Sequence, residues 1–395
     1  MRILFVTPFV PSRERPSPFH HIRYLSRSHE VFLVCLQHDE REKRYLSDLA
    51  PLCGIRAVPC SSSAALLRCA TKLASPTPLF AAYCQDPSFK RAVEETLSAE
   101  PFDLLHVQHL RGCWAALGTS DLPKTYDSQD CFSLLMRRLS ESSPHPLWKL
   151  LYWTESLKMP AFEREVLRGF DAVTCCSPVD QAELQRMAPD RPVHYLPNGV
   201  DLNHFKPCPA RDRAEDRVLF VGRLSYLPNR DALEYLLDRI LPVVRSRRPS
   251  LRFRVVGGGI SKKLERRLRS LSWVEFAGHS DDVRLHHQWS SVSLAPMRLG
   301  VGTNFKIIEA MASGLPVVTT PKGCEGLRLE AGRDLLVGGD SKELAEAILS
   351  LLENPQRRQE LGRAARSYVE REHDWDKIGR RLEEIQLDAV SRKSN

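Results

Sequence analysis

The sequence lacks any apolar run long enough to cross a membrane. The best candidate among its 395 residues, Leu73–Gln85, is short and is broken by Pro76 and Pro78, whereas a spanning helix needs about 20 apolar residues. The apolar stretch Ile3–Val10 leads into Pro11 and a charged segment without a cleavage site, so it is interpreted as a first strand rather than as a signal peptide. These features predict a soluble globular chain.

The sequence also lacks the residue spacing of a metal site. Its eleven cysteines include no C-x2-C pair, and we expect them to be reduced and mostly buried. His106 with His109, and the histidines at 286–287, come nearest to a ligand pair, but no cluster of Cys or His completes either of them. The sequence therefore predicts neither a metal ion nor a bound cofactor.

Basic residues are in modest excess, with 57 Lys and Arg against 49 Asp and Glu and a formal net charge of +8. Much of the excess lies in residues 245–254 and 262–269, where the spacing is typical of a solvated helix surface. Few aromatic residues stand beside these charges, which argues against nucleic acid as a partner. Anionic small molecules and a negatively charged membrane surface are compatible with this charge.

What the sequence does contain is a repeated alternation of short apolar runs with longer helical segments, which is typical of parallel α/β folds. The predicted strands are 3–7, 30–36, 104–107, 124–126, 172–175 and 193–196 in the first half and 218–221, 252–256, 274–277, 292–295, 316–319 and 334–337 in the second. The principal predicted helices are 19–28, 88–99, 146–168, 229–247, 262–271, 281–290, 306–312, 341–353 and 355–372. The pattern predicts two doubly wound, Rossmann-like α/β domains.

The two halves join at the turn-like segment Pro197–Asp201, which is followed by a polar stretch of weak periodicity. We therefore expect an acceptor-side domain over residues 1–198, a second domain over residues 199–372, and a C-terminal helix over residues 373–395 that crosses back to the first domain. Parallel sheets bind ligands beyond the carboxyl ends of their strands, so two facing domains would enclose a ligand in a cleft.

The most informative segment is residues 298–320, where a predicted strand leads through a glycine-containing loop into a helix that begins near residue 305. Unpaired amides and the local dipole make a helix N-terminus a ready phosphate site. For this segment alone, an ordinary helix start with surface charges is an alternative of equal weight. The candidate ligand-binding residues here are Arg298, Gly302, Thr303, Asn304 and Phe305, with the amides of 300–304 as phosphate donors.

Lys306 and Glu309 lie three residues apart in the first turn of this helix, so both side chains can face the loop. A cation at Lys306 would meet phosphate oxygens, and a carboxylate at Glu309 would accept hydrogen bonds from sugar hydroxyls. The alternative reading of both is an ordinary pair of surface charges.

Two more loops at strand ends are suited to phosphate. Gly222 and Arg223 follow one predicted strand, and an arginine there can hold a diphosphate through two parallel hydrogen bonds. Gly258 is the middle of three glycines after another strand, where a ligand can approach the backbone closely. A surface arginine and a tight turn are the alternatives, but three such loops in one domain together favour a phosphate site.

These motifs resemble those of the retaining glycosyltransferases of family four. The matching text is "VLFVGRL", "VVGGG", "VEFAGHSDD", "KIIEAMASGLPVVTT", "GLRLEAGRDLLV" and "REHDW" over residues 193–376, with "MRILFVTPFVP", "HEVFLV" and "FDLLHV" in the first half. The resemblance implies the GT-B fold, in which two Rossmann-like domains face each other. It also implies a nucleoside-diphosphate sugar as substrate and a reaction that needs no metal.

The resemblance assigns roles to individual residues of the second half. Glu309 matches the family glutamate that holds the nucleotide ribose, but Val301 stands where the family usually has a second glutamate near the sugar. Arg223 matches the phosphate-binding arginine, whereas the usual lysine six residues later is Asn229. We expect Lys306, which the common motif lacks, to supply the missing positive charge.

The first half departs further from the family pattern. The usual glycine-rich loop after the first strand is here the glycine-free segment 11–19. Asp127, in "TYDSQD", stands where many members carry a histidine near the donor, so Asp127 is a catalytic candidate and Asp130 a weaker one. Carboxylates that cap a loop or helix are an alternative of at least equal weight.

The resulting hypothesis is transfer of a sugar from a nucleoside-diphosphate donor to a hydroxyl acceptor, with retained anomeric configuration, in bacterial glycan, glycolipid or glycosylated-metabolite synthesis. Arg223, Lys306 and the loop amides would stabilise the departing phosphate. A donor-binding module without catalysis and a sugar-nucleotide epimerase are the alternatives.

The acceptor is a small molecule, a glycan or a lipid-linked molecule. Trp148–Trp153, with Lys158, Arg164 and Arg168, could form a basic amphipathic surface that touches a membrane or a lipid-linked acceptor. The favoured alternative is an internal helix with a partly wet side. We expect the chain to be cytoplasmic. If the basic amphipathic surface forms, we expect it to contact the inner face of the membrane peripherally.

Overall fold

The computed structural model describes residues 1–119, 121–143, 145–207, 216–300 and 302–394. The chain forms two compact units. Unit 1 comprises Met1–Asn198 and Trp375–Asn395, and unit 2 comprises Gly199–Asp374. Each unit is built on its own parallel sheet, as the alternating pattern of the sequence predicts.

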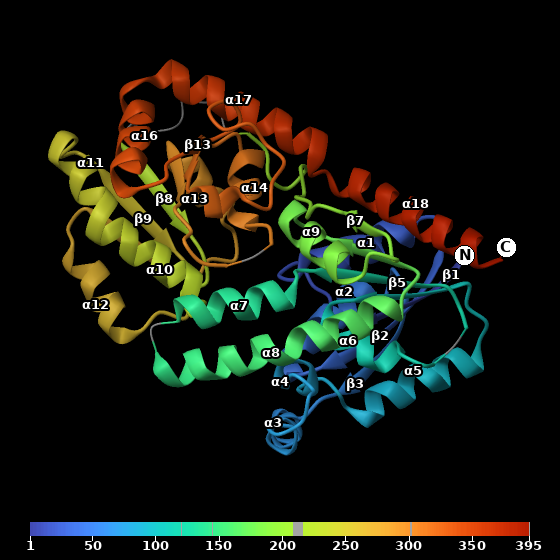
Figure 1. The fold of residues 1–395 in the computed structure, drawn as a ribbon. Helices are drawn as coiled ribbons and strands as arrows, with labels where there is room; N and C mark the ends of the chain where they lie inside the picture. Colours follow the sequence, from blue (N-terminus) through green and yellow to red (C-terminus); the bar gives the residue numbers. More distant parts are fainter. Residues whose placement is uncertain (120, 144, 208–215, 301, 395) are drawn as a thin grey trace. The chain divides into compact units, whose positions relative to one another are not determined.

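Unit 1 has seven parallel strands in the order β3-β2-β1-β4-β5-β6-β7. The strands are β1 (Arg2–Thr7), β2 (Glu30–Gln37), β3 (Gly54–Pro59), β4 (Leu104–Gln108), β5 (Lys124–Gln129), β6 (Ala172–Cys175) and β7 (Val193–Tyr195). The helices are α1 (Pro16–Leu25), η1 (Glu40–Glu42), α2 (Lys43–Leu49), α3 (Ser62–Thr71), α4 (Leu79–Ala82), α5 (Pro87–Ala99), α6 (Leu110–Ala116), α7 (Phe132–Ser142), α8 (Pro146–Arg168), α9 (Pro178–Met187) and α18 (Trp375–Ser394). Figure 1 shows α7 and α8 side by side, and they pack closely together.

Unit 2 has six parallel strands in the order β10-β9-β8-β11-β12-β13. The strands are β8 (Arg217–Val221), β9 (Arg252–Val256), β10 (Val274–Gly278), β11 (Val292–Ala295), β12 (Val317–Thr319) and β13 (Leu336–Val337). The helices are α10 (Leu227–Tyr235), η3 (Leu236–Ile240), α11 (Leu241–Arg247), α12 (Lys262–Ser270), α13 (Arg284–Trp289), α14 (Phe305–Ala312), α15 (Pro321–Cys324), α16 (Ser341–Glu353) and α17 (Pro355–Glu372).

Both faces of the central strands β8, β11 and β12 are buried, which explains why these strands are nearly continuous apolar runs, whereas the edge strand β10 alternates exposed and half-buried residues. Val218 and Phe220 of β8 face one core, which α10, α11 and α16 complete. Leu219 of the same strand faces a second core, which includes Ile308 of α14 and Tyr368 of α17. The alternation of side chains along β8 thus joins two helical layers to one sheet.

The C-terminal helix α18 belongs to unit 1, where it packs against α1 and lies beside β5 and β6. The ring of Trp375 stacks on His20 with centroids 4.6 Å apart. Gly379 lies directly against the ring of Tyr24, because a Cβ at this position would come within 2.2 Å of that ring. This glycine therefore sets how closely α18 approaches α1.

Two of the differences from the sequence predictions have a clear physical cause. Strand β3 was not predicted, because Gly54–Pro59 begins with glycine and ends with proline, and both residues are unfavourable in strands. The single helix predicted over residues 229–247 is interrupted by the π-helical turn η3. Pro242 follows that turn and has no N–H to donate to the preceding turn, so the hydrogen-bond ladder shifts there.

The helices of the described residues are all too short or too polar to cross a bilayer. The cysteines for which the structure gives positions are free thiols, most of them buried.

Candidate active site

The predicted phosphate loops of unit 2 meet where the order of strands reverses. Strands β8 and β11 are neighbours, with Val218 opposite Val292, although four α-helices, the π-helical turn η3 and two strands separate them in the chain. The loop after β8 carries Gly222 and Arg223, and the loop after β11 leads into α14. A reversal of this kind opens a crevice beyond the carboxyl ends of the strands, which is where parallel sheets bind ligands.

The glycines after β8 and β9 allow their two loops to touch. The Gly222 N–H donates to the Val256 carbonyl oxygen at 2.9 Å, and the Leu224 N–H donates to the Gly258 carbonyl oxygen at 2.8 Å. A Cβ on Gly257, whose φ is +148°, would lie 1.9 Å from the Gly222 oxygen. The glycine run therefore has a packing role, and ligand contact by Gly222 and Gly258 stays a prediction.

Helix α14 begins without a side-chain cap. Its N-cap residue, Asn304, has no side-chain hydrogen bond to the first turn. The Asn304 Nδ2 instead donates to the Gly323 carbonyl oxygen at 2.7 Å. Gly302, with φ +70°, turns the chain into the helix, and Thr303 and Phe305 are half-buried. The Asn304 side chain thus does not cap α14, and a helix start of this kind is suited to an acceptor of hydrogen bonds.

Lys306 lies at this helix start and is held by Asn229 of α10. The Lys306 Nζ donates to the Asn229 Oδ1 at 2.5 Å, and it lies 5.6 Å from the ring centre of Phe220. The Asn229 Nδ2 donates to the Arg223 carbonyl oxygen at 3.0 Å. One amide side chain therefore links the lysine to the loop that carries Arg223.

Burial shifts the pKa values of Lys306 and Glu309 toward each other. Both side chains keep some exposed surface, but protein surrounds them on most sides. Burial lowers the pKa of Lys306 to about 8, against the opposing charge of Glu309. It raises the pKa of Glu309 to about 7, against the opposing charge of Lys306. Burial destabilises the charged form of each group.

Glu309 and Arg223 both lack side-chain partners within the described residues. The Glu309 carboxylate accepts no hydrogen bond and forms no ion pair there, and the exposed Arg223 guanidinium forms none either. Polar groups in folded proteins are usually satisfied when they are enclosed, so a carboxylate in this state is suited to a ligand. Arg223, Lys306 and Glu309 thus offer two cations and one acceptor at the crevice.

Arg298, predicted as a donor-binding residue, is already occupied. Its guanidinium forms two hydrogen bonds to the Asp231 carboxylate, at 2.6 and 3.0 Å, and lies 4.4 Å from the ring centre of Tyr235. The pKa of Arg298 is raised, chiefly by its hydrogen bonds to the Asp231 carboxylate. Its role toward a donor stays a prediction. Val301, the other unusual position of this loop, lies outside the described residues.

In unit 1, Asp127 lies at the end of β5 and has no exposed surface. Its carboxylate accepts hydrogen bonds from Gln108 Nε2 at 2.9 Å and from Gln129 Nε2 at 2.7 Å. Burial raises its pKa to about 6, although the bond from Gln129 opposes this. The nearby Asp130 carboxyl has its pKa raised to about 7, chiefly by burial. In this arrangement Asp127 orients the two glutamines, and its catalytic role stays a prediction.

His109 was not selected from the sequence as a site residue, yet it occupies the reversal point of the unit 1 sheet. It follows β4, the neighbour of β1, in a left-handed conformation with φ +76°. Such a conformation is costly for a residue other than glycine and often marks a functional position. Burial keeps its pKa well below the ordinary value, so the imidazole is neutral. The available signal was a histidine directly after a buried strand.

An apolar cavity of about 300 Å³ lies beside His109 in unit 1. The Phe80 ring lines the cavity and lies 5.9 Å from the His109 ring. The other lining residues are Leu79, Tyr83, Arg111, Met136, Leu151, Tyr152 and Glu155. Most of its lining is aliphatic or aromatic, which suits an uncharged, apolar group rather than a phosphate.

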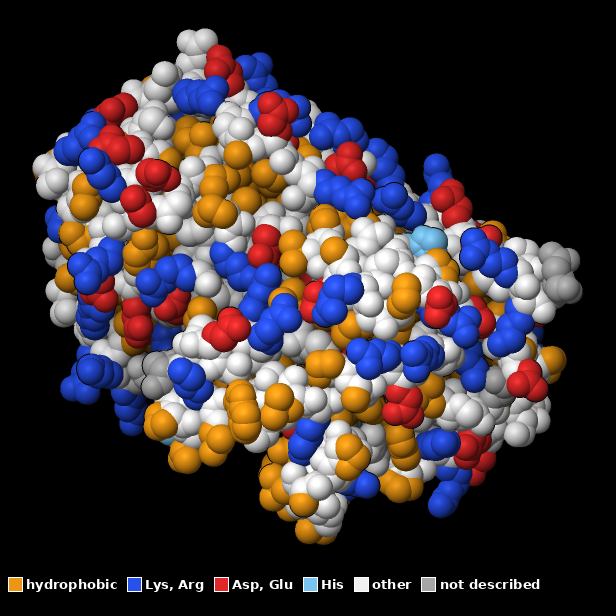
Figure 2. Space-filling view, in the orientation of Figure 1, with side chains coloured by type: hydrophobic (Ala, Val, Ile, Leu, Met, Phe, Trp, Pro, Cys, Tyr) orange, Lys and Arg blue, Asp and Glu red, His pale blue; other side chains and the backbone are white. Residues whose placement is uncertain are grey.

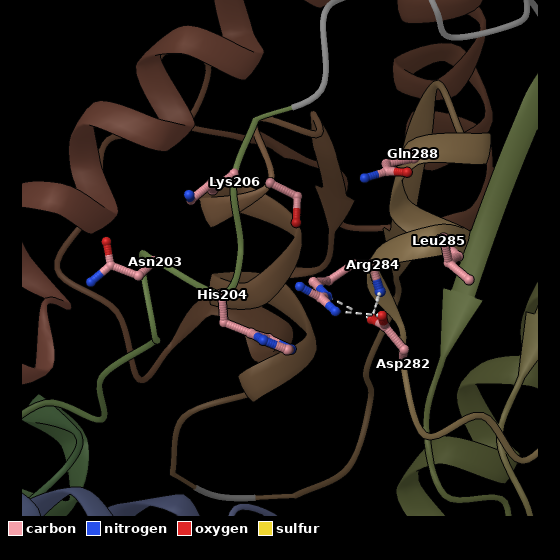
Figure 3. Close-up of a pocket in the computed structure, with 8 residues that line it drawn as sticks. Asn203, His204, Lys206, Asp282, Arg284, Leu285 and Gln288 are labelled. Carbon is pink, nitrogen blue, oxygen red and sulfur yellow. Dashed lines mark hydrogen bonds and ion pairs between the residues drawn. The ribbon is translucent and has the colours of Figure 1, made fainter.

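A second hollow, of about 350 Å³, lies in unit 2 between the segment before β8 and helix α13 (Figure 3). Its lining residues are Asn203, His204, Lys206, Asp282, Arg284, Leu285, Gln288 and Ser313. Figure 3 shows Arg284 bonded to Asp282, with its Nε 2.8 Å from one carboxylate oxygen. The hydrogen bond from Arg284 lowers the pKa of Asp282 to about 2. The Arg284 guanidinium is thus already paired with Asp282, and none of the predicted donor residues lines this hollow.

Two parallel α/β sheets in one chain, each with a reversal of strand order, define the GT-B class of fold. The chain matches a sucrose-phosphate synthase from Thermosynechococcus elongatus with a TM-score of 0.73 and 16% identity, over 99% of this chain and 100% of that one. It matches HepE from Anabaena, solved with UDP, with a TM-score of 0.70 and 17% identity, over 97% and 99% of the two chains. The predicted fold class is confirmed.

Two family models then narrow the class. The description "Glycosyltransferase Family 4" matches residues 19–204, and "Glycosyl transferases group 1" matches residues 215–354. Together they span most of the chain, which belongs to the family 4 glycosyltransferases.

A curated relative in Mycobacterium tuberculosis is the GDP-mannose-dependent alpha-(1-6)-phosphatidylinositol monomannoside mannosyltransferase. It is 30% identical over 246 residues, which are 55% of this chain and 63% of the relative. The chain spans less than two thirds of the length of the curated relatives it matches first.

Proposed function

We propose that this chain transfers a sugar from a nucleoside-diphosphate donor to a hydroxyl acceptor with retained anomeric configuration. The observation that carries the proposal is the group of Lys306, Asn229 and Arg223 beside the uncapped start of α14. Preorganised cations and amides at one crevice are suited to a diphosphate. The fold match to a structure solved with UDP agrees with this choice.

In the proposed reaction the bond between the sugar and the β-phosphate breaks, and negative charge builds on that phosphate. Lys306, Arg223 and the first amides of α14 stabilise the charge, so no metal is needed for this step. The leaving phosphate takes the proton of the acceptor hydroxyl as the new glycosidic bond forms. Glu309 accepts hydrogen bonds from the ribose hydroxyls, which holds the nucleotide in place.

The acceptor side of the proposal rests on unit 1. His109 and the apolar cavity beside Phe80 offer a neutral imidazole next to an apolar surface. A lipid-linked or glycolipid acceptor fits such a surface, and the mycobacterial relative is described as acting on a phosphatidylinositol mannoside. We place the reaction in the cytoplasm, in glycan, glycolipid or glycosylated-metabolite synthesis.

The donor is tested by thermal stabilisation of the full chain with UDP-, GDP- and ADP-sugars. A ligand that binds only the folded state raises the melting temperature. At a concentration of a hundred times its Kd, it adds about 2.7 kcal/mol to the free energy of unfolding. One donor class should stabilise the chain, equally in EDTA, and Lys306→Met should abolish the shift. If none of these sugars stabilises the wild-type chain, the donor site is refuted.

The alternatives differ in what happens to the bound donor. A glycosyltransferase should release the nucleoside diphosphate slowly without acceptor and faster with one, and the product anomer should match the donor. Saturable binding without any release would instead indicate a donor-binding module. Conversion of the donor to its sugar epimer would indicate an epimerase, and both outcomes would contradict sugar transfer.

A further inference from the structure

Two helices of unit 1 leave large apolar side chains in water. On α8, Leu150 is 58% exposed, Trp153 52% and Leu157 62%. On α3, Leu66 is 64% exposed and Leu67 is 67% exposed. Single exposed leucines are ordinary on protein surfaces, but a contiguous group that includes tryptophan marks a contact surface.

The exposed residues of α8 form a stripe. Leu150, Trp153 and Leu157 recur at intervals of three and four, which places them on one side of the helix. The opposite side of α8 is buried against unit 1 through residues such as Met159 and Glu163. The helix is therefore apolar on its outer side as well as on its inner side, which internal packing does not explain.

Helices α3 and α8 belong to one surface. The Lys158 Nζ donates to the Leu73 carbonyl oxygen at 2.9 Å, which ties α8 to the end of α3. Leu73 itself is 61% exposed. Figure 2 shows hydrophobic side chains gathered over the positions that α8 and α3 occupy in Figure 1. We call this surface the α3–α8 face and define it by Leu66, Leu67, Leu73, Leu147, Leu150, Trp153 and Leu157.

The charges around the α3–α8 face are predominantly positive. No Asp or Glu occurs between Asp48 and Asp86, the stretch that contains α3. In α8, Glu155 is buried and accepts hydrogen bonds from the Leu79 and Phe80 amides, at 3.0 and 3.1 Å.

The second inward acid of α8, Glu163, is buried as well and bonds amides at the start of α7. On the exposed side of α8 the basic residues Lys149, Arg164 and Arg168 outnumber the single acid Glu165. Lys72 adds an exposed cation at the end of α3. The two acids of α8 that could neutralise the face are thus turned inward, and its rim is cationic.

We propose that the α3–α8 face docks on an anionic lipid bilayer. Leucine and tryptophan side chains would enter the interface between headgroups and acyl chains, and the basic rim would meet anionic headgroups. A second copy of the chain fits less well, because two such faces would bring cationic rims together. The proposal does not depend on the donor or on the reaction.

The test is flotation of the full chain with vesicles of phosphatidylcholine alone or mixed with phosphatidylglycerol. Binding should require phosphatidylglycerol and weaken with added salt. The double variant Trp153→Gln with Leu157→Gln should weaken binding by about tenfold or more, since it removes two inserting side chains. Leu387→Gln is the matched control, because Leu387 is 46% exposed on α18, away from this face.

Charge is tested separately from apolar insertion. Lys149→Gln and Arg164→Gln should each weaken binding by about fivefold, whereas Lys262→Gln and Lys263→Gln on α12 should change it little. All these side chains are exposed, so melting temperatures should stay unchanged and show that the variants fold.

Three outcomes would overturn the proposal. The first is that the chain binds both vesicle types equally or binds neither of them. The second is that the Trp153 and Leu157 double variant binds vesicles as well as the wild type. The third is a dimer in sedimentation that this variant converts to monomer without any vesicle binding, which would assign the face to a second copy.

Discussion

The strand ends of the two sheets differ in how far their polar groups are satisfied. In unit 2 the crevice presents an exposed Arg223 and a Glu309 carboxylate without a partner in the described chain. In unit 1 the carboxylate that the sequence predicts as catalytic, Asp127, is buried and bonded by Gln108 and Gln129. In both sheets the strand order reverses next to the first strand, β1 or β8, so topology does not cause this difference in hydrogen bonding.

The comparison separates groups prepared for a ligand from groups that hold the protein together. A buried carboxylate with its hydrogen bonds complete contributes to the fold, and removing a partner is costly. A crowded carboxylate without hydrogen bonds destabilises the free protein and is relieved when a ligand donates to it. We therefore expect substitutions in unit 2 to change donor affinity and substitutions in unit 1 to change stability.

The largest effect on catalysis should come from Lys306→Met, which removes the charge and keeps much of the side chain. The loss of one preorganised charged group from the developing phosphate charge should lower kcat/KM by about 10²- to 10³-fold. Release of nucleoside diphosphate measures this loss. Lys263→Met, an exposed lysine of α12, is the control and should have little effect.

The contact of Lys306 with Asn229 allows an exchange that sharpens this result. In the double variant Asn229→Lys with Lys306→Asn the cation comes from α10 and the amide from α14, in the same contact. We expect this double variant to recover more than half of the decrease in log(kcat/KM) that Lys306→Met causes. A double variant as inactive as Lys306→Met would show that α14 itself must carry the cation.

In unit 1 the largest effect should fall on stability. Glu163 has no exposed surface and accepts hydrogen bonds from the Phe132 and Ser133 amides, both at 2.9 Å. Glu163→Ala should cost about 3 kcal/mol, because buried donors lose their acceptor. Urea unfolding measures the cost, with Glu165→Ala, an exposed neighbour, expected within about 0.5 kcal/mol of the wild type. Donor affinity of the folded chain should not change.

Much of unit 2 could be predicted from its sequence because a phosphate crevice needs residues of few kinds at fixed points after strands. The loops after β8 and β9 can touch only because Gly222 and Gly257 are glycines. These glycines, and a cation at a helix start, can be recognised in the sequence. The partner of Lys306 could not be read, since Asn229 lies 77 residues away and meets it only through the pairing of β8 with β11.

Unit 1 was less predictable because some of its buried polar groups are bonded by residues that are distant in sequence. Asp127 meets Gln108 across two neighbouring strands, and His109 is marked by a backbone angle that no composition reveals. Strand β3 lacks strand-forming residues at both ends and forms because β2 pairs with it along its length. Tertiary contacts decide such elements.

The pKa values at the unit 2 crevice predict a maximum of donor affinity between about pH 7 and 8. Lys306, with a pKa of about 8, loses its charge above that range, and Glu309, with a pKa of about 7, loses its charge below it. Calorimetry from pH 5 to 10 should show affinity falling by up to about tenfold per pH unit on each side. Lys306→Arg should remove the decline at high pH and leave the decline at low pH.

The free protein should show the opposite trend in stability. The folded chain holds the Glu309 proton more tightly than the unfolded chain between pH 4.5 and about 7, so this group's contribution falls as pH rises through that window. Lys306 binds fewer protons when folded between about pH 8 and 10.5, so its contribution rises there. Urea midpoints of the wild type and Glu309→Gln at pH 5 and 7.5 measure this, and an unchanged difference between the two would contradict the burial of Glu309.

The smallest effects should distinguish two arginines of the same crevice. Arg223 has no side-chain partner in the described chain, so Arg223→Gln should weaken donor binding by about tenfold, the loss of a charged hydrogen bond. Arg298 is held by Asp231, so Arg298→Gln should change donor affinity by less than about twofold and cost at most about 1 kcal/mol of stability. Calorimetry with the same donor compares the two. A larger loss of affinity for Arg298→Gln than for Arg223→Gln would mean that the donor draws Arg298 away from Asp231, and an existing ion pair would then not exclude a residue from ligand binding.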